Sequence, residues 1–159
     1  MTDNNQKIRP AAKSARRRAR EFAVQGIYQW LLTREGVAAI ERFLQDSTTA
    51  FVRADAELFR TILIGAIKGV DALNVALRPH VDRELAEVSP VELAILYAGA
   101  YEIIHMPQTP YPVIVNESIE LAKTFGGTDG HKFVNGVLDK LAAVVRAAEI
   151  EAVRAKRQR

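Results

Sequence analysis

A segment near the middle of this 159-residue chain, residues 89–104, constrains the fold more than any other. Ser89 can cap a helix, Pro90 suits the first helical position, and Glu92 completes a capping box. Beyond Pro90 the segment carries only two charged residues, Glu92 and Glu102. A helix that is apolar nearly all round must be covered on every side by other elements. The segment therefore predicts a helix at the centre of the fold, from about residue 90 to residue 104.

The other long stretches of the chain also show a helical pattern, because their apolar residues recur at steps of three and four positions. Glycines and prolines close several of these patterns. No stretch alternates apolar and polar residues in the way that indicates a strand. We therefore predict an all-α, single-domain bundle of about six or seven helices. Besides the central one, the predicted helices run from about residue 11 to 32, from 37 to a break at 46–49, from 55 to 77, from about 112 to 125, and from about 128 to 148, where we expect fraying into the tail.

The helix predicted over residues 55–77 contains two glycines, Gly65 and Gly69. Each weakens the helix by roughly 1 kcal/mol relative to alanine. The exception is a glycine that lets a neighbouring helix approach closely, where the missing side chain improves packing.

Composition excludes several classes of protein. Hydrophobic residues make up 48% of the chain and charged residues 26%, which is typical of a soluble globular protein. Cysteine is absent, which excludes disulfides, iron–sulfur clusters and thiol nucleophiles. No apolar run approaches the roughly 20 residues that a membrane span needs, and no apolar signal core follows the basic N-terminal stretch. We expect a cytoplasmic protein that does not bind a membrane.

The charges are segregated along the chain. Residues 1–20 hold seven basic residues and one acidic residue, residues 150–159 hold four and one, and the body between them has a net charge of −6. Basic segments on an acidic body favour the binding of a polyanion such as a nucleic acid. Basic termini are also common as merely solvated tails, so charge alone leaves both interpretations open. We divide the chain into a flexible basic arm (1–12), a helical RNA-binding domain (13–148) and a basic C-terminal tail (149–159).

No group of residues has the pattern of a catalytic or metal site. His80, His105 and His131 lie far apart in the sequence, and none belongs to a metal-binding motif. The glycine-rich segment 126–130 joins two predicted helices, whereas a phosphate-binding loop follows a strand. Glu102 is a single carboxylate in the central helix, and we interpret it as a buried hydrogen-bond anchor. The sequence predicts a protein that is not an enzyme and needs no metal or cofactor.

Four arginines near the start of the first helix form what we call the arginine cluster: Arg16, Arg17, Arg18 and Arg20. They occupy consecutive angular positions, so we expect at least three of them to face water. One guanidinium group can donate hydrogen bonds to two phosphate oxygens at once, and it can stack on an unpaired base. Both properties favour single-stranded RNA as the ligand. Cations at a helix N-terminus oppose the macrodipole, and four of them there suggest a use beyond solubility. Solubility of the helix is the alternative explanation.

Four segments of the chain resemble the NusB family of bacterial transcription antitermination factors. They are RRRAREFAVQGIYQW (16–30), PVELAILYAGAYEI (90–103), VNESIELAKTFG (115–126) and HKFVNGVLDK (131–140), in matching order and spacing over about residues 14–145. The resemblance implies an all-helical RNA-binding factor. Such a factor joins NusE, a ribosomal protein of the small subunit, on boxA-type single-stranded RNA of ribosomal RNA operons, and acts indirectly on the RNA polymerase complex.

The resemblance also implies which residues contact RNA. The arginine-rich start of the family falls on the arginine cluster of this chain. The loop and helix start that lie beside RNA in the family match Asp129, Lys132 and Phe133, and the ring of Phe133 can stack on a base. The resemblance therefore gives the glycine-rich segment a second interpretation, as a loop beside the arginine cluster, whereas a simple stop between two helices is the alternative.

A second set of residues would face the protein partner. Tyr28 and Leu32 border the apolar face of the first helix, and Glu92 could pair with a basic residue of NusE. Covering neighbouring helices is the alternative role for Tyr28 and Leu32, and the capping box is the alternative role for Glu92. The chain departs from the resemblance at Tyr97, where an arginine is usual, and its basic tail matches none of the segments that carry the resemblance.

Three other interpretations follow from the sequence. A helical scaffold or dimerisation protein would carry the same helices without binding RNA. A homodimer could hide the arginines of an RNA-binding factor. The RNA-binding domain of some ribosomal RNA cytosine methyltransferases also resembles NusB, but the length of this chain argues against that assignment because no methyl-donor domain follows.

Overall fold

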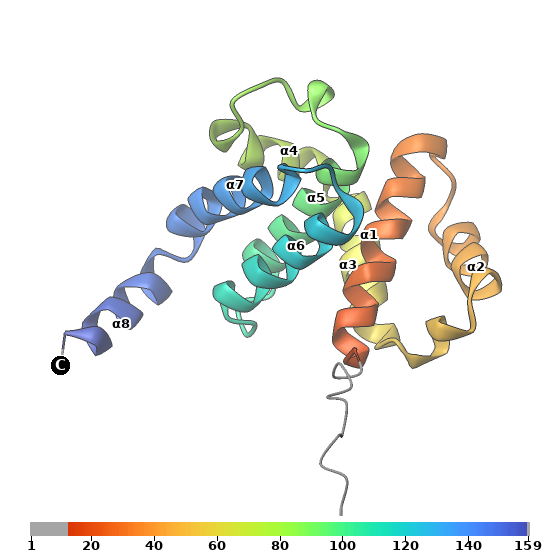
Figure 1. The fold of residues 1–159 in the computed structure, drawn as a ribbon, viewed down its shortest axis with the longest axis horizontal. Coiled ribbons are helices and arrows are strands. Elements are labelled where there is room, and N and C mark those ends of the chain that lie inside the picture. Colours follow the sequence, from red (N-terminus) through yellow and green to blue (C-terminus); the bar gives the residue numbers. More distant parts are fainter. Residues whose placement is uncertain (1–12, 159) are drawn as a thin grey trace, which may run out of the picture.

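The computed structural model describes residues 13–158, which form α-helices and short 3-10 helices and contain no strand (Figure 1). This confirms the all-α prediction. The predicted arm, residues 1–12, lies outside the described residues. The elements are α1 (Ala15–Thr33), α2 (Val37–Ser47), η1 (Thr49–Arg53), α3 (Ala56–Lys68), α4 (Val70–Leu77), η2 (Arg78–His80), η3 (Leu85–Glu87), α5 (Pro90–His105), α6 (Tyr111–Phe125), α7 (Gly130–Val145) and α8 (Ala147–Arg157).

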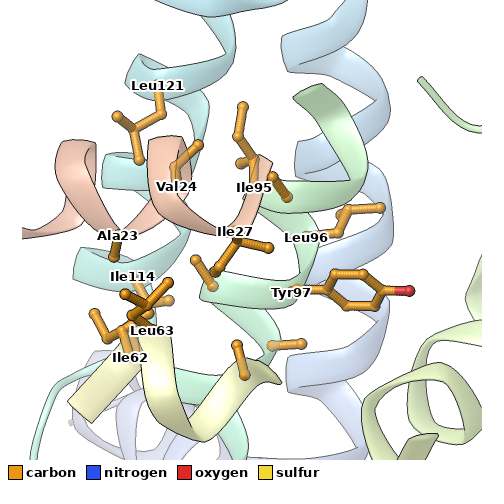
Figure 2. Close-up of a cluster of buried hydrophobic side chains, with 14 of the residues drawn as sticks. Ala23, Val24, Ile27, Ile62, Leu63, Ile95, Leu96, Tyr97, Ile114 and Leu121 are labelled. Carbon is orange, nitrogen blue, oxygen red and sulfur yellow. The ribbon is translucent and has the colours of Figure 1, made fainter. Parts of the chain in front are cut away.

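Helix α5 is the central element, as its lack of charge predicts. It packs against α1, α3, α4, α6 and α7. Its start is capped by the Ser89 hydroxyl, which accepts a hydrogen bond from the Glu92 amide at 3.3 Å. Figure 2 shows Ile27 of α1 and Ile95 of α5 in the core, with Leu63 of α3 close by. The core thus lies around α5, and the outer helices are fixed by what they bury against it.

The helix predicted over residues 55–77 is interrupted. Residue Gly69 separates α3 from α4 and flanks both. Gly65, in contrast, lies within α3 and lets that helix approach α5, since a Cβ atom at this position would overlap the ring of Tyr101. One of the two glycines therefore breaks the helix, and the other permits close packing.

The last predicted helix is also divided. Helix α7 ends at Val145, Arg146 leaves helical geometry, and α8 continues to Arg157. The tail expected to fray is therefore helical over most of its length. These two interruptions, at Gly69 and Arg146, explain why residues 13–158 form eight α-helices where the sequence indicates six or seven.

Replacing Gly65 by alanine tests the close approach of α3 and α5. The added methyl group would force the Tyr101 ring to move, and we expect Gly65→Ala to lower the free energy of unfolding by about 1–3 kcal/mol. The control is Gly136→Ala in α7, where a Cβ atom meets nothing within 4 Å. Because alanine favours helix, Gly136→Ala should raise the free energy of unfolding by up to about 1 kcal/mol. Urea unfolding followed by circular dichroism measures both, and equal effects would contradict the close approach.

Candidate nucleic-acid interface

The four residues of the arginine cluster differ in exposure. Arg16 and Arg17 are exposed, Arg18 is half-buried, and Arg20 is buried. The expectation that at least three of them face water is therefore met only in part, since two are exposed and Arg18 is partly exposed. The cluster begins directly after Ser14, whose hydroxyl caps α1 by accepting a hydrogen bond from the Arg17 amide at 3.1 Å.

Arg20 is a structural residue, which corrects its assignment as an RNA contact. Its side chain is paired with Glu102 of α5: Nε donates to Oε2 at 2.9 Å and Nη2 donates to Oε1 at 2.9 Å. Arg20 is 5% exposed and Glu102 is 2% exposed, so a polynucleotide has no access to this guanidinium. The interpretation of Glu102 as a buried anchor is confirmed. The pair fixes the basic end of α1 against the C-terminal half of α5.

Arg17 is held at the surface by a carboxylate of α6. Its Nε donates to Glu117 Oε2 at 3.0 Å and its Nη2 donates to Oε1 at 2.9 Å. The hydrogen bonds and the charge of Glu117 raise the pKa of the Arg17 guanidinium above its ordinary value. Almost half of the side-chain surface of Arg17 remains exposed, at 45%. The guanidinium is thus oriented, while its Nη1 nitrogen takes no part in the pair.

Arg16 is held more loosely. Its Nη1 lies 3.9 Å from Asp55 Oδ2, beyond hydrogen-bonding distance, and half of its side chain is exposed. Asp55 has another role, since its Oδ1 accepts a hydrogen bond from the Leu58 amide and caps α3. Arg16 can therefore move to a ligand without breaking a specific bond.

The segment predicted to lie beside RNA opens helix α7. Asp129 and Lys132 are exposed and form an ion pair of 3.5 Å across one turn. Asp129 flanks the helix but makes no side-chain cap bond. Phe133 is half-buried, and the Arg83 guanidinium lies 4.5 Å from its ring centroid. Sequence reasoning did not single out Arg83, because the two arginines between α4 and α5, Arg78 and Arg83, form neither a cluster nor a periodic pattern.

This segment does not lie beside the arginine cluster, which corrects the expectation. Glu92 Oε1 faces Gly130 so closely that a Cβ atom there would overlap it. Glu92 opens α5, whereas Arg20 pairs with Glu102 at the other end of that helix. Figure 1 shows the same separation, with the loop between α6 and α7 near the end of α1 that is remote from its N-terminus. The two predicted RNA-contacting regions therefore occupy opposite ends of the bundle.

Two of the three residues predicted to face a protein partner, Tyr28 and Leu32, line shallow grooves. One groove, of about 290 Å³, lies between α1, α5 and α6 and includes Tyr28, Val91 and Phe125. The other, of about 420 Å³, lies between α1 and α2 and includes Tyr28, Leu32 and Phe43. Tyr28 is shared by both grooves and is 36% exposed, and Leu32 is 57% exposed. Covering neighbouring helices therefore accounts for less than half of the Leu32 surface, since 57% of it is exposed.

Glu92 lines neither groove, although its chain neighbour Val91 lines the first one. It is half-buried, and its Oε2 accepts a hydrogen bond from the Ser89 hydroxyl at 2.8 Å. The other half of a capping box, a bond from the Ser89 amide to the Glu92 carboxylate, is not among the hydrogen bonds of residues 13–158. The Glu92 side chain is thus only partly engaged in capping, and it joins the start of α5 to the start of α7.

Comparison with known proteins identifies the family. The model of the NusB family matches residues 17–143. The chain belongs to the NusB family. It is 54% identical over 153 residues to the transcription antitermination protein NusB of Ralstonia pickettii, covering 96% of this chain and 98% of that protein. It is 55% identical over 147 residues to the NusB of Chromobacterium violaceum, covering 92% and 98%.

Solved structures of NusB share the fold. A structure of T. maritima NusB aligns with a TM-score of 0.69 at 25% identity, covering 82% of this chain and 92% of that one. The NusB fold also appears in a crystal structure of the antitermination factors NusB and NusE in complex with dsRNA, with a TM-score of 0.71 at 20% identity, covering 82% of this chain and 97% of that one. The residues matched by the NusB family model end before Arg146 and α8.

Tyr97, where the family resemblance implies an arginine, makes a polar contact of its own. Its hydroxyl donates a hydrogen bond to the side-chain oxygen of Asn74 in α4, and burial raises the pKa of that hydroxyl. The buried acid of the same helix, Glu102, has its partner in Arg20. Within residues 13–158 no buried side-chain polar atom lacks a partner.

Two further features bear on the class of protein. None of the helices described here is both long and apolar enough to cross a membrane. Across residues 13–158, no three side chains of the metal-binding types gather closely enough to hold an ion.

Removing Arg20 tests its structural role. Arg20→Ala leaves the buried Glu102 carboxylate without its partner, and we expect it to lower the free energy of unfolding by about 3–5 kcal/mol. The control is Arg16→Ala, an exposed change in the same turn and a half of helix, which should alter it by no more than about 0.5 kcal/mol. Both values come from urea unfolding. Similar values for the two variants would show that the Arg20–Glu102 pair does not hold α1 in place.

Proposed function

We propose that this protein is a transcription antitermination factor that binds boxA-type single-stranded RNA of ribosomal RNA operons together with NusE, a ribosomal protein of the small subunit. In this proposal it acts on the RNA polymerase complex indirectly, in the cytoplasm, and catalyses no reaction. Membership of the NusB family supports it, as does the fold shared with a NusB that was solved with NusE and dsRNA. The observation that carries the RNA-binding part is the pair of exposed guanidinium groups, Arg16 and Arg17, on the first turn of α1.

Arg17 is the best-prepared phosphate ligand in the cluster. Glu117 binds its Nε and Nη2, so the guanidinium plane is fixed before RNA arrives and Nη1 remains for a phosphate oxygen. Fixing the group in advance lowers the entropy lost on binding. The carboxylate is 18% exposed, so it orients the arginine without placing much negative charge in the path of the strand. Glu117 is therefore a positioning residue for RNA binding.

The start of α7 supplies a second contact region. The exposed ion pair between Asp129 and Lys132 contributes little stability, so Lys132 can turn to a phosphate at small cost. A guanidinium already covers one side of the Phe133 ring, so a base would stack on Arg83 or on the remaining part of the ring. Reaching this region from Glu117 requires RNA to extend by about 12 Å along α6, the rise of eight helical residues.

NusE would cover the two grooves on either side of Tyr28. An apolar centre with polar residues at its edge is the usual arrangement of a protein interface. Tyr28, Leu32 and Phe43 supply the apolar centre, and Glu92 supplies an acidic edge. Because Glu92 also contacts Gly130, the protein partner and the second RNA-contacting region would be neighbours.

The salt dependence of RNA binding tests the role of the arginine cluster. Each phosphate neutralised on a single strand contributes about −0.7 to the slope of log affinity against log salt, so Arg16→Ala with Arg17→Ala should weaken binding and lower the slope by about 1.4. Fluorescence anisotropy with a boxA-type RNA measures both quantities. The control is Arg42→Ala, which removes an exposed arginine of α2. Wild-type affinity and slope in the double variant would refute the assignment, and a protein that binds no RNA would favour the scaffold interpretation.

Reversing the charge of Glu92 tests the protein interface. We expect Glu92→Lys to weaken NusE binding by about tenfold or more, because it places a cation where a basic residue of the partner is expected. The control is Ser89→Ala, which removes the cap of α5 at a cost of about 1 kcal/mol but keeps the Glu92 charge. Isothermal calorimetry with NusE should show normal affinity for Ser89→Ala. If both variants bind NusE equally well, Glu92 serves only the fold.

A further inference from the structure

Helix α8 has no buried residue, which sets it apart from the other seven α-helices of residues 13–158. An isolated helix of eleven residues has marginal stability in water, because its few backbone hydrogen bonds barely offset the free-energy cost of nucleation. Burial of an apolar face usually supplies the missing stability. Since α8 lacks such a face, something else must define its position.

A buried arginine at the joint between α7 and α8 supplies that definition. Arg146 is 6% exposed, and its guanidinium donates hydrogen bonds to the carbonyl oxygens of Ile103 at 2.8 Å, Met106 at 3.0 Å, Thr109 at 3.0 Å and Glu102 at 3.2 Å. These carbonyls end α5 and form the turn that leads to α6. A cation at this place also compensates the negative end of the α5 dipole.

The first turn of α8 is tied to the same turn of chain. Glu149 accepts a hydrogen bond from Arg146 Nη1 at 2.6 Å and another from the Tyr111 amide at 3.0 Å. Tyr111 is the first residue of α6. The direction of α8 is therefore set by specific bonds to the end of α5 and the start of α6.

This joint lies at the same end of the bundle as the arginine cluster. The carboxylate of Glu102 binds Arg20 of α1, while its carbonyl binds Arg146. On α6, Glu117 binds Arg17, less than two turns after Tyr111. The basic start of α1 and the first turn of α8 consequently lie on either side of the start of α6, and Figure 1 shows α8 continuing from there away from the bundle.

The exposed surface of α8 is basic. Arg154, Lys156 and Arg157 lie in its last turn, and all three are exposed. Glu151 lies 3.7 Å from Arg154, but both side chains are largely in water, so the pair holds the cation only weakly. Val153 is the one large apolar residue that α8 exposes, which is too little for an apolar docking surface. Charge complementarity favours a polyanion.

We propose that α8 is a second phosphate-binding element, on which an RNA strand that leaves the arginine cluster continues across the first turns of α6 to Arg154, Lys156 and Arg157. The inference rests on the proposed RNA-binding function and lengthens its footprint. Contacts to phosphates carry no sequence information directly, so α8 adds affinity and leaves sequence preference unchanged. It lies outside the residues matched by the family model and adds to what they supply.

The test removes the charges and keeps the helix. The triple variant Arg154→Ala, Lys156→Ala and Arg157→Ala retains strong helix formers and the whole Arg146 joint, so circular dichroism should be unchanged. The matched control removes three exposed cations on α2 and α3, namely Arg42, Arg60 and Lys68, and so lowers the net charge equally. Changing Arg146 itself would disturb the fold as well, which makes the charge variants the better test.

Affinity and salt slope are measured by anisotropy with two single-stranded RNAs, a boxA-type core of about 8 nucleotides and the same core extended at both ends to about 16. On the longer RNA the α8 variant should bind several-fold more weakly, with a slope lower by about 2, the value for three phosphate contacts. On the core RNA it should match the wild type. The control variant should show no such difference between the two RNAs.

Two outcomes would overturn the inference alone. The first is an α8 variant with wild-type affinity and slope on the longer RNA while Arg16→Ala with Arg17→Ala still weakens binding to the core. The second is an equal loss on both RNAs that the control variant reproduces, which would show a general effect of net charge. A wild-type protein that binds neither RNA would refute the proposed function, and this inference with it.

Discussion

The buried pair between Arg20 and Glu102 is the interaction on which the arrangement of the basic surface depends. Burying two charges costs several kcal/mol unless both are fully bonded, and here the guanidinium and the carboxylate meet through two nitrogens and two oxygens. Such a pair adds little net stability compared with apolar residues, but it tolerates only one register between two helices. It sets how far α1 extends past the end of α5, and so places Arg16 and Arg17 at the rim of the bundle.

The sequence predicts the centre of this fold well and its joints poorly. The scarcity of charge along α5 identifies the central helix, because a helix that is buried on all sides can carry few charged residues. The break at Arg146 has no such local signature. It depends on carbonyls of the chain around residues 102–109, which are remote in sequence, and the apolar pattern of α7 continues past the break. Local periodicity reports which side of a helix is buried, but it does not report where the helix ends against another part of the chain.

The same limit applies to the candidate site. The sequence shows four arginines in one helix start, but the one that is buried is decided by Glu102, which is 82 positions away. The glycine-rich loop was expected beside these arginines, yet α6 carries the chain to the other end of the bundle before the loop begins. Chain segments that precede and follow one long helix can therefore belong to different surfaces. The arrangement instead brings the loop next to Glu92, so on the proposed function one protein partner would border the second RNA-contacting region.

The basic segment meets acidic partners within the same molecule, and whether RNA can bind depends on how firmly they hold it. Lys13 pairs with Glu21, Arg17 with Glu117 and Arg20 with Glu102, while Arg16 lies near Asp55. Ion pairs between exposed groups contribute about 0–1 kcal/mol, since water screens them. A polynucleotide offers many phosphates at once and releases its condensed counterions on binding, a gain that exceeds the loss of one such pair. On the proposed function the exposed cations can therefore be shared with RNA, whereas Arg20, which is only 5% exposed and is bonded to Glu102, cannot. The acidic body thus leaves Arg16 and Arg17 accessible, and Glu117 orients Arg17. The buried Arg20 holds in place the helix that carries both.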